Sequence, residues 1–413
     1  MLSLNDWLAV LENRVSPDNI NLDLERVKLV SSRHELADFN AKVIKIAGTN
    51  GKGSSLAALN QIYTSAGFKV ACYSSPHLFK FNERLKINDA YVDDNWWSRA
   101  FYYLDNSAKE HNLTYFETIT LAAFWIVKQH TVDIVLLEIG LGGRLDAVNV
   151  AAADIGLITS IGMDHQDRLG STLNDIAREK AGIINNNMSI VFSGRNNRDI
   201  IEDKANEHNS SFYALDMDFS WKILNENWLY TCCEKSYSIG IPNIHPDVAA
   251  GVIKCIHLLQ NDFPVSKPHI YSNLTAINQY ARCQVIKKNY PIIIDVAHNK
   301  DAAMYLKKFI QFNFAEKKLR IVFSCLNTKD HKSMIEVFDC DDVIWYLSDL
   351  NVCNGVQKEF LRDAVISDSF LLSNVSSAFE KACIDCKSNE VVVVFGSFHM
   401  AKEALLSLGD SHN

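Results

Sequence analysis

Residues 48–55 form a glycine-rich segment of a kind that binds phosphate groups. Its small residues let backbone N–H groups turn toward an anion, and Lys52 adds a positive charge. The segment departs twice from the strict P-loop pattern, because Ile46 replaces the first glycine and Gly53 replaces the Ser or Thr after the lysine. We interpret it as a phosphate loop that opens a helix. The alternative is a glycine-rich turn with a solvated lysine.

Polar side chains also stand at the ends of other apolar runs, which we expect to be strands. Glu138 ends one run, Ser75 follows a second, and Asp164 and His165 follow a third. Oxygen ligands of this kind suit Mg²⁺, and open parallel sheets bind ligands beyond the carboxyl ends of their strands. A single Glu also fits a surface charge, and a single His fits a structural role. Three such positions together favour a shared site.

Cys383 and Cys386 form a C-x-x-C pair, which fits either a metal or redox site or two unrelated thiols on a helix. The sequence contains no second C-x-x-C pair and no His pair at zinc spacing. We therefore prefer free thiols, and we expect the ten cysteines to be reduced.

The elements that carry these residues alternate between strand and helix. Residues 43–47 are predicted to form a buried strand that leads through the phosphate loop into a helix over 56–66. Residues 132–139 and 154–160 are two further apolar runs that end in polar or glycine-rich segments, as expected for a parallel sheet covered on both faces. Residues 1–40 are predicted to be mainly helical, and residues 211–237 to form antiparallel strands.

From residue 292 the alternation starts again and predicts a second α/β domain. The expected strands are 292–296, 319–325, 343–347 and 391–395, and the expected helices are 301–312, 332–338, 376–386 and 401–408. We therefore expect an α/β protein with an N-terminal P-loop-type mononucleotide-binding domain (1–278), built on a mostly parallel sheet, and a smaller C-terminal Rossmann-like domain (279–413).

The composition limits the classes of function. The chain has 413 residues, 41 Lys and Arg against 49 Asp and Glu, and a net charge of −8, which argues against a general nucleic-acid binder. No early segment has the features of a secretory signal, and no run approaches the roughly 20 apolar residues of a membrane span. We expect a cytoplasmic protein that acts without nucleic acid or membrane.

Six motifs appear in order along the chain. They are residues 48–54, 73–78, 138–147, 178–182, 295–299 and 395–399. Together they resemble the bifunctional dihydrofolate synthase/folylpolyglutamate synthase family of Mur ligases, and the resemblance covers nearly the whole chain. It implies an ATP-dependent amide ligase that converts the carboxylate of an acceptor into an acyl phosphate. The amino group of L-glutamate then attacks the acyl carbon and forms an amide. The implied acceptors are 7,8-dihydropteroate and the γ-carboxylate of reduced folates.

The resemblance also assigns roles to individual residues. The expected ATP-binding residues are Thr49, Asn50, Gly51, Lys52, Asp247, Arg282 and Asp295. The expected ligands of two Mg²⁺ ions are Ser75, Glu138, His165 and Lys180, the last as a carbamate. Dihydropteroate or folate would contact Thr114, Tyr115, Phe116, Glu117, Leu145, Asp146 and Ala147, with residues 21–27 as a folate loop. Glutamate would lie near His298 and Ser397. The residues with catalytic roles would be Lys52, Lys180 and His298.

Three positions depart from the family pattern. Asp247 stands where the family usually has Asn near the nucleotide, Cys283 replaces a more usual Phe after Arg282, and Asp23 occupies a position that is often Gly. The first two bear on ATP binding and the third on the folate loop. The positions of Lys52 and Lys180 are intact, so we expect an active enzyme.

Other functions fit parts of the same pattern. One alternative is a ligase that only extends polyglutamate and has no dihydropteroate activity, which an assay with dihydropteroate, ATP and glutamate would distinguish. A nucleotide-binding switch would need only the phosphate loop, and a murein-precursor ligase would use a different acceptor. The segment around Tyr115 and Phe116 favours a pterin, although core packing is the other explanation for these rings. We expect small-molecule partners only, and a monomer.

Overall fold

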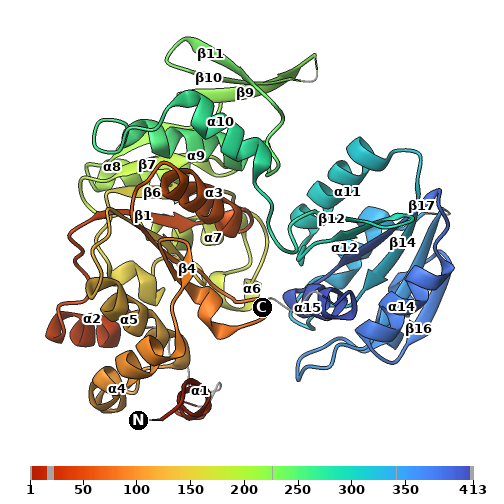
Figure 1. Ribbon diagram of the computed structural model, residues 1–413, viewed down its shortest axis with the longest axis horizontal. Coiled ribbons are helices and arrows are strands. Elements are labelled where there is room, and N and C mark those ends of the chain that lie inside the picture. The colour runs from red at the N-terminus through yellow and green to blue at the C-terminus, as the bar shows by residue number, and fades with distance from the viewer. Residues whose placement is uncertain (1, 16–22, 226, 341, 410–413) are drawn as a thin grey trace. The chain divides into compact units, whose positions relative to one another are not determined.

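The computed structural model describes residues 2–15, 23–225, 227–340 and 342–409, and the chain divides into two compact units. The first unit comprises Met1–Gly162 and Leu169–Ile277. The second comprises Met163–Arg168 and Asn278–Asn413. Each unit has a sheet with helices around it and its own hydrophobic core (Figure 1).

An eight-stranded sheet forms the centre of the first unit. Its strands, in spatial order, are β4 (Ala90–Tyr91), β3 (Leu85–Ile87), β2 (Val70–Tyr73), β5 (Ile134–Glu138), β1 (Lys42–Ala47), β6 (Ile155–Ile158), β7 (Ser189–Phe192) and β8 (Ser211–Ala214). The six strands from β2 to β8 are parallel, and β3 and β4 run antiparallel at one edge. Since β1 lies between β5 and β6, the segments that follow these strands emerge at one edge of the sheet.

Helices cover this sheet and position the segments at its edge. They are α1 (Leu4–Glu12), α2 (Leu24–Arg33), α3 (Lys52–Ser65), α4 (Asp94–Glu110), α5 (Tyr115–Lys128), α7 (Leu173–Ala181), α8 (Arg198–Glu207), α9 (Pro246–Leu258) and α10 (Lys267–Ala276), with the 3₁₀ helices η2 (Phe81–Arg84) and η3 (Ala147–Val150). The short helix α6 (Gln166–Leu169) falls largely within Met163–Arg168, which groups with the second unit. Ile44 and Ile46 of β1 share one buried cluster with residues of α3 and α9. The intervening Lys45 is on the other face, because side chains alternate along a strand.

A small antiparallel sheet packs beside α9. It consists of β9 (Phe219–Leu224), β10 (Asn227–Cys232) and β11 (Lys235–Ile239). The antiparallel arrangement predicted for residues 211–237 is therefore correct for β9, β10 and the part of β11 that it covers, but wrong for β8. That strand pairs in parallel with β7 and extends the large sheet. Its four residues are too few for a sequence pattern to distinguish the two arrangements.

The second unit contains a six-stranded sheet. Its spatial order is β12 (Gln284–Lys287), β13 (Pro291–Ile294), β17 (Glu390–Phe395), β14 (Lys318–Phe323), β15 (Val343–Ser348) and β16 (Ser369–Leu372). All neighbours are parallel except β12 and β13. The helices are α11 (Lys300–Phe314), α12 (His331–Phe338), α13 (Lys358–Ala364), α14 (Val375–Asp385) and α15 (Phe398–Ser407).

The predicted fold class is confirmed, since each unit is an α/β structure with a mostly parallel sheet. The strand at 343–347 and the helix at 332–338 agree with the structure to within one residue. The short elements α13 and β16 were not predicted. In the described part of the chain, no helix is long and apolar enough to cross a membrane.

Candidate active site

The glycine-rich loop after β1 is shaped by close backbone approaches. Gly51 precedes α3 with φ +91°, a conformation that favours glycine, and a Cβ there would lie 2.6 Å from Cγ2 of Val248. A Cβ on Gly48 would lie 1.9 Å from Oγ1 of Thr159. These two positions therefore require glycine, which places the loop tightly against the segment that follows β6.

Hydrogen bonds fix the loop to its neighbours. The Thr49 and Asn50 amides donate to the backbone and side-chain oxygens of Ser160, at 2.8 and 2.9 Å. Nζ of Lys52 donates to the Gly48 carbonyl at 2.9 Å, so the lysine folds back over its own loop. The loop thus combines a cation with the N-terminus of a 14-residue helix, an arrangement that can bind phosphate.

A buried carboxylate lies at the same edge of the sheet. Glu138 ends β5 opposite Ile46 of β1, and only 4% of its surface is exposed. Its Oε2 accepts a hydrogen bond from the Ser75 amide at 3.2 Å, so two of the predicted metal ligands are adjacent. A divalent cation held by carboxylate and hydroxyl oxygens would interact favourably with such a buried carboxylate.

The other two predicted metal ligands lie on different segments. Lys180 is 4% exposed in the last turn of α7, so it is not the surface lysine that an isolated helix would suggest. His165 belongs to Met163–Arg168, which groups with the second unit, and its Nε2 is 3.2 Å from Nζ of Lys329. Among the described residues, no three His, Cys, Asp or Glu side chains are grouped closely enough to hold a metal by themselves.

The predicted acceptor segments 21–27 and 114–117 meet in the first unit. Thr114 caps α5, and its amide donates to Glu117 Oε2 at 2.7 Å. The other oxygen of Glu117 accepts from Nη2 of Arg26 at 3.0 Å. Of this folate loop, residues 21 and 22 lie outside the described residues. Asp23 caps α2 by accepting from the Glu25 amide at 2.9 Å, which explains an acidic residue at this position.

A second contact joins the 114–117 segment to the 145–147 segment. Gly140 lies against Phe116, since a Cβ there would be 2.6 Å from the tip of the ring and 3.2 Å from Oδ2 of Asp146. The Asp146 carboxylate accepts from the amides of Leu141 and Val148, at 2.8 and 2.9 Å. Burial raises the pKa of Asp146 to about 6. An aromatic ring and a buried carboxyl group are therefore adjacent in this part of the first unit.

The remaining acceptor residues flank this pair. Leu145 is half-buried, Ala147 begins η3 with 3% exposure, and Tyr115 is half-buried in the first turn of α5. Burial raises the pKa of Tyr115, while the charge of Arg84 acts to lower it. Arg84 is a buried cation, 7% exposed, that donates to Nδ1 of His77 at 3.1 Å. Sequence reasoning missed it, although it follows closely after the 73–78 motif.

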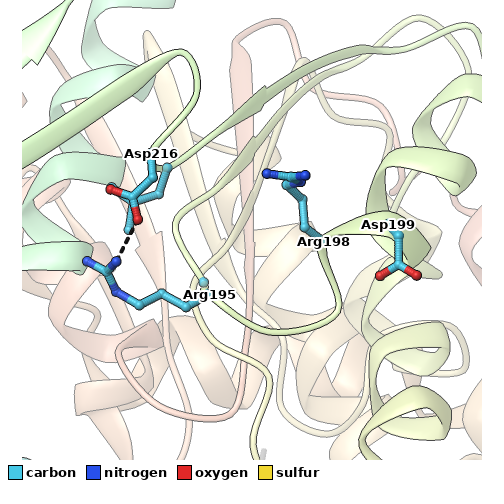
Figure 2. A pocket seen from close by; sticks show the side chains of 6 residues that line it. Arg195, Arg198, Asp199 and Asp216 are labelled. Carbon is cyan, nitrogen blue, oxygen red and sulfur yellow. Dashed lines mark hydrogen bonds and ion pairs between the residues drawn. The ribbon is translucent and has the colours of Figure 1, made fainter.

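Asp247 is bound within an ionic cluster. Nη2 and Nε of Arg195 donate to its two carboxylate oxygens at 2.7 and 3.0 Å, and Nε1 of Trp221 donates at 2.7 Å. Arg195 also pairs with Asp216 at 2.6 Å (Figure 2). Arg195 and Asp216 line an open cavity of about 450 Å³ with Arg198 and three other residues. Sequence reasoning missed Arg195, which belongs to no motif.

In the second unit, Asp295 follows β13 and is 9% exposed. Its carboxylate accepts from the amides of Cys283 and Ala297, each at 2.6 Å, and burial raises its pKa. The guanidinium of Arg282 lies 5.5 Å from the centroid of the Phe398 ring. The Cys283 contact uses the backbone N–H, so replacing the usual phenylalanine does not remove it.

A charged cluster surrounds His298. Its Nε2 donates to Oδ2 of Asp164 at 3.2 Å, and Lys329 donates to the other oxygen. Burial opposes ionisation of Asp164, but the His298 hydrogen bond and the nearby positive charges outweigh it and hold the pKa well below its usual range. Ser397, 5% exposed, caps α15 by accepting from Met400. Lys329, which no motif contains, is a further polar residue of this site.

Comparisons with known proteins show to which family the chain belongs. Residues 46–230 match the Mur ligase middle domain, and residues 281–398 match the Mur ligase glutamate ligase domain. The dihydrofolate synthase/folylpolyglutamate synthase of Escherichia coli (strain K12) is 31% identical over 397 residues, which cover 96% of this chain and 93% of that protein. The chain belongs to this Mur ligase family.

Two solved structures of such Mur ligases extend the likeness to the whole fold. E. coli FolC in complex with DHPP and ADP matches with a TM-score of 0.93 and 31% identity, covering 99% of this chain and 98% of that one. The bifunctional folylpolyglutamate synthase/dihydrofolate synthase of Yersinia pestis, complexed with AMPPNP and a Mn ion, matches with a TM-score of 0.92 and 33% identity, covering 99% and 98%.

Proposed function

We propose that this Mur ligase uses ATP to join L-glutamate to 7,8-dihydropteroate, giving dihydrofolate, and to the γ-carboxylate of reduced folates, giving a polyglutamate tail. The full-length likeness to bifunctional relatives supports the reaction class. In this proposal, residues 1–278 bind ATP and the folate acceptor, and residues 279–413 contribute the glutamate-binding side.

The convergence of the acceptor segments is the observation that carries the choice of substrate. Arg26 bonds to Glu117, and Phe116 lies against Gly140 beside Asp146. Three segments far apart in the sequence thereby present a ring, a carboxyl group and a cation in one part of the first unit. This set fits a pterin, which has a flat aromatic face and hydrogen-bonding edges.

The reaction needs an activated carboxylate, because an amine does not displace oxygen from a carboxylate ion. The acceptor carboxylate attacks the γ-phosphorus of ATP, forming a C–O–P bond and releasing ADP. The amino group of glutamate then attacks the acyl carbon, the C–O bond breaks, and inorganic phosphate leaves with that oxygen. In this proposal, Lys52 and the N-terminus of α3 balance the charge of the phosphates.

The AMPPNP and Mn ion bound by a relative imply ATP and a divalent metal, and the buried Glu138 beside Ser75 supports a site for such an ion. Ser75, Glu138, His165 and a carbamate of Lys180 would provide oxygen and nitrogen ligands for two Mg²⁺ ions, whose chemistry would be to neutralise charge on the phosphates. Burial of Lys180 supports the carbamate, because a lysine that served only as a surface charge would be exposed to solvent.

On the glutamate side, His298 and Lys329 supply positive or hydrogen-bonding groups and Ser397 supplies a hydroxyl. Asp164 orients His298 through Nε2 and holds Lys329 at the same carboxylate. We propose that these residues bind and orient the incoming amino acid.

An acceptor panel tests the proposal. Purified protein is given ATP, Mg²⁺ and glutamate with dihydropteroate, with a reduced folate monoglutamate, or with neither, and ADP and product mass are read together. Products from both acceptors support the bifunctional assignment. Product from the folate alone identifies a polyglutamate-extending enzyme, and ATP hydrolysis that ignores every acceptor identifies a nucleotide switch.

A further inference from the structure

Lys45 is a lysine in the middle of a buried strand. Its surface is 0% exposed, and it is among the largest fully buried side chains of the described chain. Fully buried lysines are rare, because an ammonium group loses its hydration there. In the described part of the chain, no carboxylate lies within ion-pair distance of its nitrogen. Burial lowers the pKa of Lys45 to about 7, while the charge of Asp146 acts to raise it. Such a costly residue in β1 calls for a specific role.

The Lys45 amine is held by a single residue. Nζ donates to Oδ1 of Asn149 at 2.9 Å and lies 3.4 Å from its carbonyl oxygen. Nδ2 of Asn149 in turn donates to the Gly182 carbonyl at 2.8 Å and to the Arg144 carbonyl at 3.3 Å. Asn149 lies in η3, so one side chain links β1 to the loop before η3 and to the residue that follows α7.

The loop around Arg144 and the segment that follows α7, which Asn149 joins, are packed closely against each other. A Cβ on Gly143 would lie 2.7 Å from the Glu179 carbonyl, and a Cβ on Gly182 would lie 2.3 Å from Cβ of Arg144. The Arg144 amide also donates to the Glu179 carbonyl at 2.8 Å. A displacement of Asn149 would therefore shift the loop and the helix end together.

We propose that Lys45 acts through Asn149 as a positioning residue for two parts of the ligase site, the acceptor-binding loop and the end of the helix that carries Lys180. The inference rests on the proposed function, which places Asp146 at the acceptor. The lysine touches no substrate. It fixes the distance between β1 and the loop before η3. Its charge also lies close enough to Asp146 to interact with that carboxyl group.

The test replaces Lys45 with Met, which is similar in length but has no amine, and Asn149 with Asp, which keeps an acceptor for Lys45 but loses both donated bonds. Lys42→Met is the matched control, because Lys42 lies on the same strand with 40% of its side chain exposed and pairs with Asp154. We expect kcat/KM for dihydropteroate to fall roughly 10- to 100-fold in Lys45→Met and Asn149→Asp. The Kd for ATP should stay within about twofold of the wild-type value, and Lys42→Met should resemble the wild type.

Hydrogen exchange gives a readout that does not depend on activity. We expect amides in residues 140–150 and 178–184 to exchange faster in Lys45→Met than in Lys42→Met, while α3 keeps its protection. Wild-type exchange in both segments would overturn the inference, even if no acceptor is turned over by the wild-type protein. Equal losses of ATP affinity and of acceptor turnover would also overturn it, because they would indicate general damage. A wild-type protein that ligates neither acceptor would overturn the proposed function.

Discussion

At the scale of single residues, the burial of Lys180 is the feature with the most direct consequence. Lys180→Ala should reduce ligation to background, because the proposed carbamate and its metal-binding oxygens are lost. Short carboxylates added to the assay should restore part of the activity. ADP release and product mass measure both effects.

Arg178→Ala is the matched control for Lys180, since Arg178 lies on the same helix with 65% of its side chain exposed. It should retain ligation. Full activity in Lys180→Ala would remove the carbamate from the account, while leaving the rest of the site in place.

Lys45 predicts a pH dependence of stability. The pKa of the Lys45 amine is about 7 in the folded protein and 10.5 in the unfolded chain. Between pH 10.5 and 7 the unfolded chain therefore binds a proton that the folded protein does not. The free energy of unfolding contributed by Lys45 should therefore decrease from pH 10.5 to about 7, with a slope of up to ~1.4 kcal/mol per pH unit, and stay constant below.

Urea unfolding of the wild type and of Lys45→Met, compared between pH 7.5 and 9, measures this slope. As the pH is lowered, the free energy of unfolding of Lys45→Met should increase relative to that of the wild type. A difference that does not change with pH would mean that the lysine has an ordinary pKa in the folded state.

At the scale of elements, Arg195 joins the loop after β7 to the N-terminus of α9. Its two bonds to Asp247 neutralise a carboxylate that, in the proposed ATP site, would repel the nucleotide. Arg195→Ala should raise the Kd for ATP about tenfold, as loss of one charge-assisted pair implies. Asp247→Asn combined with Arg195→Ala should recover most of the affinity, because the unpaired carboxylate is then absent.

Asp216→Asn is the control for this cycle, since it removes the other partner of Arg195 and leaves the Asp247 pair intact. Its ATP affinity should be near that of the wild type. A double variant that binds ATP no better than Arg195→Ala would show that charge on Asp247 is not the cause.

The elements that carry motifs were predictable from the sequence because they contain long apolar runs. The run before residue 48 and the run ending at Glu138 both indicate buried parallel strands, and the glycines between strand and helix indicate the phosphate loop. Residues 211–214 were assigned to the wrong arrangement, since four residues contain too little periodicity to specify their partner.

Contacts between segments that lie far apart in the chain could not be predicted from the sequence. The Arg26–Glu117 pair joins residues 91 positions apart, and nothing local to either residue indicates the other. Nothing in the sequence near Lys45 indicates that it is fully buried or that its amine bonds to Asn149, which is 104 positions away. The roles of Arg195 and Lys329 likewise appear only when their tertiary partners are known.

At the scale of the molecule, each unit has its own hydrophobic core, which predicts separable unfolding. Leu59 of α3 lies in the core of the first unit and Leu306 of α11 in that of the second, and both are 0% exposed. Replacing either by Ala should cost its unit about 2–5 kcal/mol. Calorimetry should then show Leu306→Ala lowering one transition while the other stays near its wild-type temperature.

Leu59→Ala provides the reciprocal variant and should lower the other transition. If both substitutions shift one common transition by similar amounts, the two units unfold as a single cooperative body and the account of separate cores is wrong.

The acyl phosphate is the central claim, because every proposed role of Lys52, Lys180 and the metal ions serves its formation. Dihydropteroate labelled with oxygen-18 in its carboxylate is incubated with protein, ATP, Mg²⁺ and glutamate, and the released phosphate is analysed by mass spectrometry. One labelled oxygen per product should appear in inorganic phosphate. Accumulation of dihydrofolate with unlabelled phosphate would contradict the mechanism.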